Sequence, residues 1–354
     1  MWLNETLADP SATPWEASFF GIDSAAARAR IAEHVRVTPL EALPSPDGLE
    51  IVGKMENAQV TGSFKARGAL NNVALLTADE RARGVVASSS GNHGRALAWA
   101  AARAGVAATI VMPEFSYPNK IEACRAEGAE VVLTPTRADA DRVAGELASP
   151  EGGGKTWVHP YDRPGTIEGA GTVGVEIAEQ APALDAVVLC VGGGGLSAGA
   201  ALALRRALGG RVAILGAEPV GADKMTRGLG AGEPVHLDEV TSRIQGINTL
   251  FAGQHNITVN AAALDAVVPL EDEVILEAQR VLVRDDEERG WSGRVVEPAG
   301  AAAYALARDI GFAPLVRSIL AKRGHRVPPD RALRVAVTVS GGNPDPAQLE
   351  AQRA

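Results

Sequence analysis

The chain has 354 residues, 46% of them hydrophobic and 22% charged, a composition that excludes disordered and collagen-like proteins. Its 34 Lys and Arg against 43 Asp and Glu give a formal net charge of −9, which argues against a nucleic-acid partner. The two cysteines, Cys124 and Cys190, exclude a disulfide framework and a cysteine-based zinc site, so both thiols are expected to be reduced.

The N-terminal segment does not have the features of a targeting signal. Residues 1–20 contain three acidic side chains and neither Lys nor Arg, so the basic start of a signal peptide is missing. Arg103 interrupts the longest Ala-rich run, and no apolar stretch is long enough to span a membrane. We therefore expect a cytoplasmic protein without a membrane partner.

Short runs rich in β-branched residues alternate along the chain with Ala-rich stretches whose apolar residues recur every three or four positions. This alternation predicts an α/β fold of mostly parallel sheets with helices on both faces. The expected strands are 50–54, 84–87, 108–112, 130–133, 156–159, 186–191, 211–216, 266–269 and 334–339. The expected helices are 63–76, 92–104, 118–127, 137–148, 166–179, 196–208 and 271–283. The segment 228–253 is the least periodic and is expected to be irregular.

The sequence Thr-Gly-Ser-Phe-Lys at positions 61–65 opens the first long helix. Its Lys65 would lie in the first turn, where the positive end of the helix dipole repels an ammonium group. The lysine is therefore either solvated at the surface or held as a neutral amine, for instance in an imine. On this motif alone the surface interpretation is favoured.

A second polar stretch, Ser88 to Gly94, separates an expected strand from an Ala-rich helix. Hydroxyl groups and free backbone N–H groups at a helix start can bind an anion. Capping of the helix needs only one such residue, whereas five of the six positions from Ser88 to His93 are polar. His93 by itself fits a hydrogen-bonded structural residue better than a base.

Four consecutive glycines, Gly192 to Gly195, follow the strand 186–191 and open another helix. Such a stretch lets backbone N–H groups wrap around a phosphate, and a structural turn would need only one or two glycines. Gly193, Gly195 and Ala198 also fit the loose dinucleotide-binding fingerprint, with Glu218 as the ribose-binding acid. That alternative leaves the first two stretches unexplained.

A fourth stretch, Ser340-Gly341-Gly342-Asn343, follows the last expected strand. The four stretches, in this order and spacing, resemble the fold type II pyridoxal-phosphate enzymes (the tryptophan synthase β superfamily), and most closely the serine/threonine dehydratases and serine racemases. The resemblance runs from about Val37 to Asn343. It implies a discontinuous cofactor-binding domain, residues 1–80 and 166–354, a small substrate-binding domain, residues 81–165, and a homodimer or a higher homo-oligomer.

The resemblance also implies roles for individual residues. Lys65 would form the imine with pyridoxal 5'-phosphate and take the Cα proton as general base. The other implied cofactor contacts are Phe64, Asn92, Gly192, Gly193, Gly194, Gly195, Leu196, Gly246 and Ser340. The implied loop for the substrate carboxylate is Ser89, Ser90, Gly91, Asn92 and His93. Ser90 also stands where racemases place a second acid/base, but we favour carboxylate binding.

Some positions depart from the family pattern. Glu168, Ala170 and Gln245 replace other residues near the expected site and so bear on substrate choice. Glu218 and the carbonyl of Ala222 match part of the family's cation site, but the next expected acid is Lys224. We therefore predict no metal site. The neighbouring Asp223 is the one acid that could complete the site, but its side chain is expected to point elsewhere if the backbone follows the family. The alternative is that the Lys224 ammonium group pairs with Glu218 in place of a metal ion.

The expected activity is that of an ammonia-lyase that converts a β-hydroxy amino acid, L-threonine or L-serine first, into a 2-oxo acid and ammonia. Within the fold, the alternatives are a racemase and a dehydratase of 3-hydroxyaspartate or a bulkier β-hydroxy amino acid. An NAD(P)-dependent oxidoreductase would leave Lys65 and Ser340 unexplained. A non-catalytic sensor of small molecules would not need an imine-forming lysine.

Overall fold

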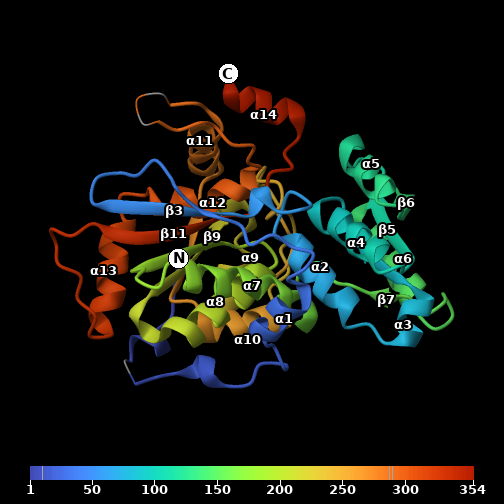
Figure 1. Ribbon diagram of the computed structural model, residues 1–354, viewed down its shortest axis with the longest axis horizontal. Helices are drawn as coiled ribbons and strands as arrows, with labels where there is room; N and C mark the ends of the chain where they lie inside the picture. The colour runs from blue at the N-terminus through green and yellow to red at the C-terminus, as the bar shows by residue number, and fades with distance from the viewer. Residues whose placement is uncertain (10, 287, 289) are drawn as a thin grey trace.

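The strands of the computed structural model, which describes residues 1–9, 11–286, 288 and 290–354, form a seven-stranded and a four-stranded sheet (Figure 1). The larger sheet has the order β1 (Trp2–Leu3), β10 (Ala266–Leu270), β9 (Ala213–Pro219), β8 (Ala186–Cys190), β11 (Leu333–Val339), β3 (Leu49–Met55) and β2 (Leu40–Ala42). The smaller sheet has the order β6 (Glu130–Thr134), β5 (Ala108–Pro113), β4 (Val85–Ser88) and β7 (Thr156–Trp157).

Both sheets have the predicted parallel pairing. Strands β10, β9, β8, β11 and β3 pair in parallel, and only the two edge strands β1 and β2 join antiparallel. All pairs of the small sheet are parallel. All nine expected strands are present, although β7 ends at Trp157, two residues earlier than predicted. Strands β1 and β2 were missed because two or three residues carry no periodic pattern.

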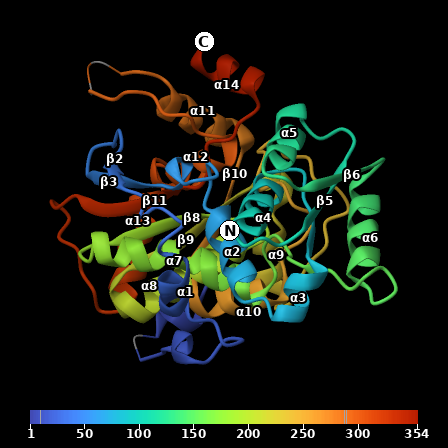
Figure 2. The same cartoon turned by 45° about the vertical axis from the view of Figure 1, so that its right-hand side comes forward.

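Helices cover both faces of each sheet. On the large sheet, α7 (Pro164–Gln180), α8 (Gly195–Leu208) and α10 (Gln254–Ala263) lie opposite α12 (Pro298–Ala307) (Figure 1). Figure 2 shows α4 (Asn92–Arg103) and α5 (Pro118–Ala126) on one side of the small sheet and α6 (Arg137–Ala148) on the other. We call residues 85–157 the small lobe, and the large sheet with its helices the large lobe.

The seven expected helices are all present; the two not yet named are α2 (Lys65–Ala74) and α11 (Asp272–Val283). The helices missed by the sequence analysis are α1 (Ser24–Ile31), α3 (Ala78–Arg83), α9 (Lys224–Ala231), α10, α12, α13 (Phe312–Lys322) and α14 (Pro346–Arg353). The expectation that 228–253 is irregular was wrong for 228–231, where α9 continues. This helix has only eight residues, of which two are glycines, so its periodicity is weak. Within the described ranges, none of the helices has the length and apolarity needed to cross a lipid bilayer.

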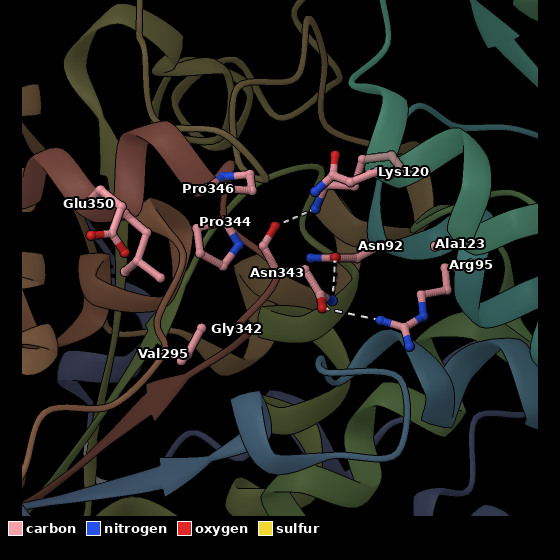
Figure 3. A pocket seen from close by; sticks show the side chains of 13 residues that line it. Asn92, Arg95, Lys120, Ala123, Val295, Gly342, Asn343, Pro344, Pro346 and Glu350 are labelled. Atoms are coloured by element: carbon pink, nitrogen blue, oxygen red, sulfur yellow. Dashed lines mark hydrogen bonds between the residues drawn. The ribbon is translucent and has the colours of Figure 1, made fainter.

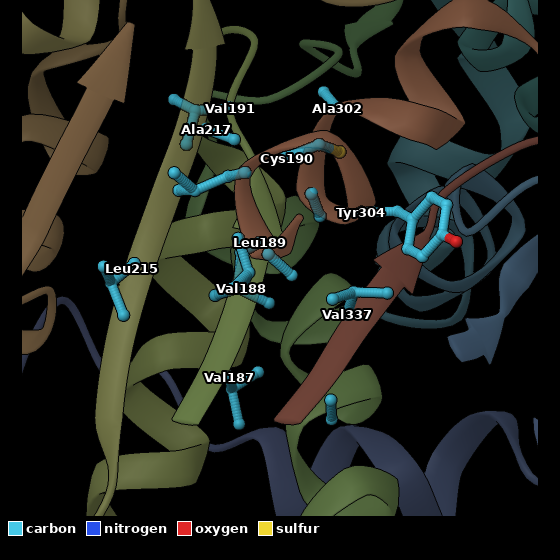
Figure 4. Close-up of a cluster of buried hydrophobic side chains, with 14 of the residues drawn as sticks. Val187, Val188, Leu189, Cys190, Val191, Leu215, Ala217, Ala302, Tyr304 and Val337 are labelled. Carbon is cyan, nitrogen blue, oxygen red and sulfur yellow. The ribbon is translucent and has the colours of Figure 1, made fainter. Parts of the chain in front are cut away.

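Small aliphatic side chains build the main core. Every residue of β8 is buried, because helices cover both faces of the parallel sheet. Figure 4 shows Val187, Val188 and Leu189 of β8 in one buried cluster with Ala302 and Tyr304 of α12, whose ten residues are all buried. A helix buried on every side has no polar face, which is why the periodicity of α12 gave no signal.

Helix α2 lies between the two lobes. Its Ala66, Ala69, Leu70 and Val73 join the apolar cluster of the small lobe, together with residues of α4 and β5. Its opposite side packs on α7 of the large lobe. The residue at the start of α2, Lys65, therefore lies where the two lobes meet.

A buried network of charges holds α2 in this position. The Arg67 guanidinium lies 2.7 Å from Glu56 Oε1 and 2.7 Å from Glu176 Oε1, and the three side chains are at most 1% exposed. Lys54 Nζ lies 2.6 Å from Glu176 Oε2. The network therefore ties α2 to the end of β3 and to α7.

Replacing Arg67 with Ala should lower the free energy of unfolding by about 3–5 kcal/mol, because Glu56 would remain buried without its cation. Urea unfolding followed by circular dichroism measures this loss. Arg142, whose guanidinium lies 2.6 Å from Glu146 at the surface, provides the control, and Arg142→Ala should change stability by less than about 1 kcal/mol. Equal losses in the two variants would contradict the prediction.

Candidate active site

The turn before α2 is bonded to the end of β11. Phe64 N donates a 3.1 Å hydrogen bond to the Ser340 carbonyl, and Ser63 forms an antiparallel bridge with Gly341. Ser340 is 2% exposed. Phe64 and Lys65 are therefore brought to the same edge of the large sheet as Ser340, which comes from a distant part of the sequence.

The Lys65 amine points toward the connection between β7 and α7. Its Nζ donates a 2.6 Å hydrogen bond to the Pro160 carbonyl and lies 5.0 Å from the centre of the Phe64 ring. Burial lowers the pKa of Lys65 to about 8, against the opposing effects of Cys190 and Glu297. A much larger fraction of this amine is therefore neutral near neutral pH than for a lysine in water, and the neutral form is the nucleophile.

The glycine loop Gly192–Gly195 joins β8 to α8 at the same edge of the sheet. Gly194 has φ +97°, a left-handed conformation that favours glycine. A methyl group on Gly193 would overlap the Tyr161 ring, and one on Gly194 would overlap Met225 Cε. Asn256 Nδ2 fixes the loop by donating to the Gly193 carbonyl over 2.8 Å. The first N–H groups of α8 have no partner within the helix, so this loop is suited to bind a phosphate.

Asn92, the first residue of α4, joins the small lobe to the large one. Its Nδ2 donates to Glu297 Oε1 over 2.7 Å and to Oε2 over 3.0 Å, and its Oδ1 accepts a 2.9 Å bond from Asn343 Nδ2. Both ends of the Asn92 amide are thus oriented by the large lobe. Its predicted role at the cofactor stays a prediction.

Glu297 is a site residue that the sequence analysis missed. It lies directly before α12, is 5% exposed, and carries a pKa raised by burial, although Lys120 and Asn92 oppose that shift. A methyl group on Gly341 would overlap its carboxylate, and one on Gly246 would lie 3.5 Å from Oε1. The available signal was Glu-Pro before an Ala-rich run, a common start of a helix.

Ser89, before α4, and His93, in its first turn, have structural contacts. Ser89 Oγ accepts from Gly94 N over 3.1 Å, although the N-cap residue of α4 is Gly91. His93 is 2% exposed, and its Nε2 lies 2.8 Å from the Val158 carbonyl. Burial lowers the pKa of His93 to about 3, so the ring is neutral and structural. Ser90 and Gly91 are partly exposed, and the role of this loop in carboxylate binding stays a prediction.

Two of the departures from the family pattern have clear contacts. The Glu168 carboxylate accepts from Asn71 Nδ2 over 2.7 Å and from Arg30 Nη1 over 3.0 Å, so it anchors α1 to α2. These contacts give Glu168 a structural role, and its effect on substrate choice stays a prediction. Gln245 Nε2 donates a 2.6 Å bond to Tyr117 Oη, which joins the loop beside Gly246 to the small lobe.

A cavity of about 300 Å³ adjoins Asn92 where the lobes meet. Figure 3 shows Asn343 at its centre, with Lys120 donating to the Asn343 carbonyl and Arg95 donating to Asn343 Oδ1 over 3.3 Å. Asn343 directly follows the Ser-Gly-Gly stretch at the end of β11. The same loop that contacts Phe64 therefore also contacts α4 and α5.

Residues 31–317 match the family model described as "Pyridoxal-phosphate dependent enzyme". The chain is 37% identical to a phenylserine dehydratase of Ralstonia pickettii, over 72% of this chain and 78% of that protein. It is 35% identical to an L-threonine ammonia-lyase of Thermotoga maritima, over 84% of this chain and 68% of that protein. The structure of maize serine racemase superposes with a TM-score of 0.81 at 31% identity, covering 93% of this chain and 95% of that one. The chain therefore belongs to the pyridoxal-phosphate-dependent enzymes of fold type II.

The cofactor of this family, pyridoxal 5'-phosphate, fits the residues present. Gly192–Gly195 have no side chains of their own and precede the N–H groups at the start of α8, and Lys65 offers an amine with a lowered pKa for the cofactor aldehyde. This favours the phosphate interpretation of the glycines over the dinucleotide one. The domain boundaries, the cytoplasmic location and the homo-oligomeric state stay predictions.

Because only the neutral amine attacks an aldehyde, the rate at which the apoprotein binds pyridoxal 5'-phosphate covalently should rise with pH and level off above about 8. Rapid mixing at a series of pH values, followed by absorbance, measures this rate. The control is N-acetyl-lysine amide, whose rate should still rise near pH 10 because its amine has an ordinary pKa. A protein profile that follows the control would contradict the lowered pKa.

Proposed function

We propose that the protein is a pyridoxal-phosphate-dependent dehydratase that converts a β-hydroxy amino acid, L-threonine or L-serine first, into a 2-oxo acid and ammonia. The observation that carries this proposal is that Lys65 and Ser340 lie at the same edge of the large sheet, joined by the hydrogen bond from Phe64 N to the Ser340 carbonyl. A hydroxyl at this position cannot hold a proton on the ring nitrogen as a carboxylate would, which favours β-elimination over transamination. A relative named as an L-threonine ammonia-lyase supports the same reaction.

The residues divide the work as follows. The bound cofactor supplies the electron sink for the substrate carbanion. The Lys65 amine, beside the Pro160 carbonyl, takes the Cα proton as general base. Gly192–Gly195 and the start of α8 hold the phosphate, and Ser90 with the neighbouring N–H groups holds the substrate carboxylate. If Ser90 instead supplied a second acid/base, the product would be the opposite enantiomer, the racemase alternative.

An aromatic cluster beside Lys65 favours a second candidate, a dehydratase of a bulkier β-hydroxy amino acid. His159 and Tyr161 flank Pro160, with ring centres 4.6 Å apart, and the Phe251 ring lies 5.7 Å from Tyr161. Burial lowers the pKa of His159 to about 4, so this wall is uncharged at neutral pH. Such a surface suits a phenyl substituent, and one relative carries the name phenylserine dehydratase.

The purified protein should be yellow, and borohydride should fix the cofactor on Lys65, which mass spectrometry of the tryptic peptides detects. Lys65→Ala should release no 2-oxo acid from L-threonine, L-serine or phenylserine, because both the imine and the general base are lost. Its circular dichroism spectrum should stay that of the wild type. A colourless protein that binds NAD would overturn the proposal.

The second functional prediction concerns Ser340. Ser340→Ala should weaken cofactor binding by about 1 kcal/mol, the contribution of one neutral hydrogen bond. Ser340→Asp should lengthen the life of the carbanion, so 2-oxo acid release should fall relative to Cα hydrogen exchange. Both rates can be followed together by proton NMR in deuterated water. An unchanged ratio in Ser340→Asp would show that this side chain does not act on the ring.

A further inference from the structure

Lys224, the first residue of α9, is fully buried. Its Nζ lies 3.4 Å from Glu218 Oε2, which is the ion pair expected from the sequence. The same ammonium group donates to the carbonyl oxygens of Ala222 over 2.8 Å, Ile247 over 3.1 Å and Val191 over 3.3 Å. One carboxylate and three backbone carbonyls therefore surround one positive charge.

This set of oxygens is of the kind that binds a hard cation. Carboxylates and backbone carbonyls are the ligands of Ca²⁺ sites. An ammonium group suits the same oxygens, because it is positively charged and has only hydrogen-bond donors. Burying an ammonium group without partners costs a large free energy. Burial accordingly lowers the pKa of Lys224, and Glu218 opposes that shift. The lysine thus places a cation among these oxygens and tethers it to the chain.

Two of the three carbonyls that Lys224 binds adjoin the two loops expected to hold the cofactor. Val191 directly precedes Gly192, and Ile247 directly follows Gly246. The two loops touch, since a methyl group on Gly192 would lie 3.2 Å from Ile247 Cα. The ammonium group therefore joins the loop of the phosphate to the loop beside Glu297.

The start of α9 supports the glycine loop in a second way. Glu218 accepts from Thr226 N over 2.7 Å and from Met225 N over 3.1 Å, so the carboxylate that pairs with Lys224 also caps the helix. The capped helix holds Met225 against Gly194, where Met225 and Asn256 leave no space for a side chain. Lys224, Glu218 and Met225 thus form one support for the glycine loop.

We propose that Lys224 is a positioning residue that acts as a built-in cation. It draws the Val191 and Ile247 carbonyls together and so sets the two cofactor loops without a bound metal ion. This inference rests on the assignment of Gly192–Gly195 to the cofactor phosphate. It predicts that the wild-type protein binds pyridoxal 5'-phosphate with the same affinity in a chelator, in K⁺ and in Mg²⁺.

Two substitutions separate the charge of Lys224 from its volume. Lys224→Ala leaves a space ringed by four oxygens, whereas Lys224→Met fills that space with an uncharged stem. With tetramethylammonium as the sole added cation, both variants should bind pyridoxal 5'-phosphate about tenfold more weakly, because the two loops lose a charge-assisted contact. An excess of K⁺ or NH₄⁺ should restore Lys224→Ala and leave Lys224→Met weak. Titration of the apoprotein, followed by tryptophan fluorescence, measures each affinity.

Arg227→Ala serves as the matched control. Arg227 lies on the same helix and pairs at the surface with Asp223, 2.8 Å away, so its loss should change neither the affinity nor the response to cations. The proposal is overturned if Lys224→Ala binds as the wild type does without K⁺, if K⁺ acts equally on both variants, or if a chelator weakens the wild type. If Lys224→Ala folds only in K⁺, a melting temperature that rises with K⁺ replaces the affinity as the readout and supports the proposal. If this variant folds with none of the cations, the proposal is overturned. A wild-type protein that binds no pyridoxal 5'-phosphate would instead refute the cofactor assignment.

Discussion

The hydrogen bond from Phe64 N to the Ser340 carbonyl is the contact on which the site depends. It joins the turn before α2 to the end of β11, two segments more than 270 residues apart, and so fixes where Lys65 begins its helix. The carboxyl ends of β8, β11 and β3 meet at this edge because these strands are parallel. The glycine loop, the lysine and the serine therefore face one another as a consequence of strand order.

Buried cations hold these segments together. Arg67 ties the start of α2 to Glu56 and Glu176, and Lys224 ties the glycine loop to the Gly246 loop. In both places the charge is buried only where carboxylates and carbonyls supply partners, as burial of an ion requires. Apolar side chains could fill the same volume, but they could not fix a backbone carbonyl at a set position. The buried charges thus fix the positions of these segments, whereas the packing of aliphatic side chains supplies most of the free energy of folding.

The sequence predicted the parallel sheets and the glycine loop because both have local patterns. Strand 186–191 is continuously apolar and Gly192–Gly195 directly follows it, so a few neighbouring residues carried the information. Glu297 and Tyr161 reach the site by contacts between distant segments, and the Glu-Pro pattern at Glu297 marks only the start of a helix. The contact of Glu168 with Arg30, 138 residues away, has no local signal either. Helix α12 was missed because it is apolar on all sides.

The contacts between the lobes involve residues at or next to the expected cofactor site. Asn92 reaches Glu297 and Asn343, Gln245 reaches Tyr117, and each pair joins the small lobe to a loop of the large one. Lys65 lies on α2 and Ser340 at the end of β11, whereas Gly192–Gly195, Gly246 and the aromatic cluster lie on connections between elements. On the proposed function, we expect the aromatic cluster to face the β-substituent, so that changes there alter substrate choice without moving Lys65. Loops on a rigid scaffold commonly divide the work in this way.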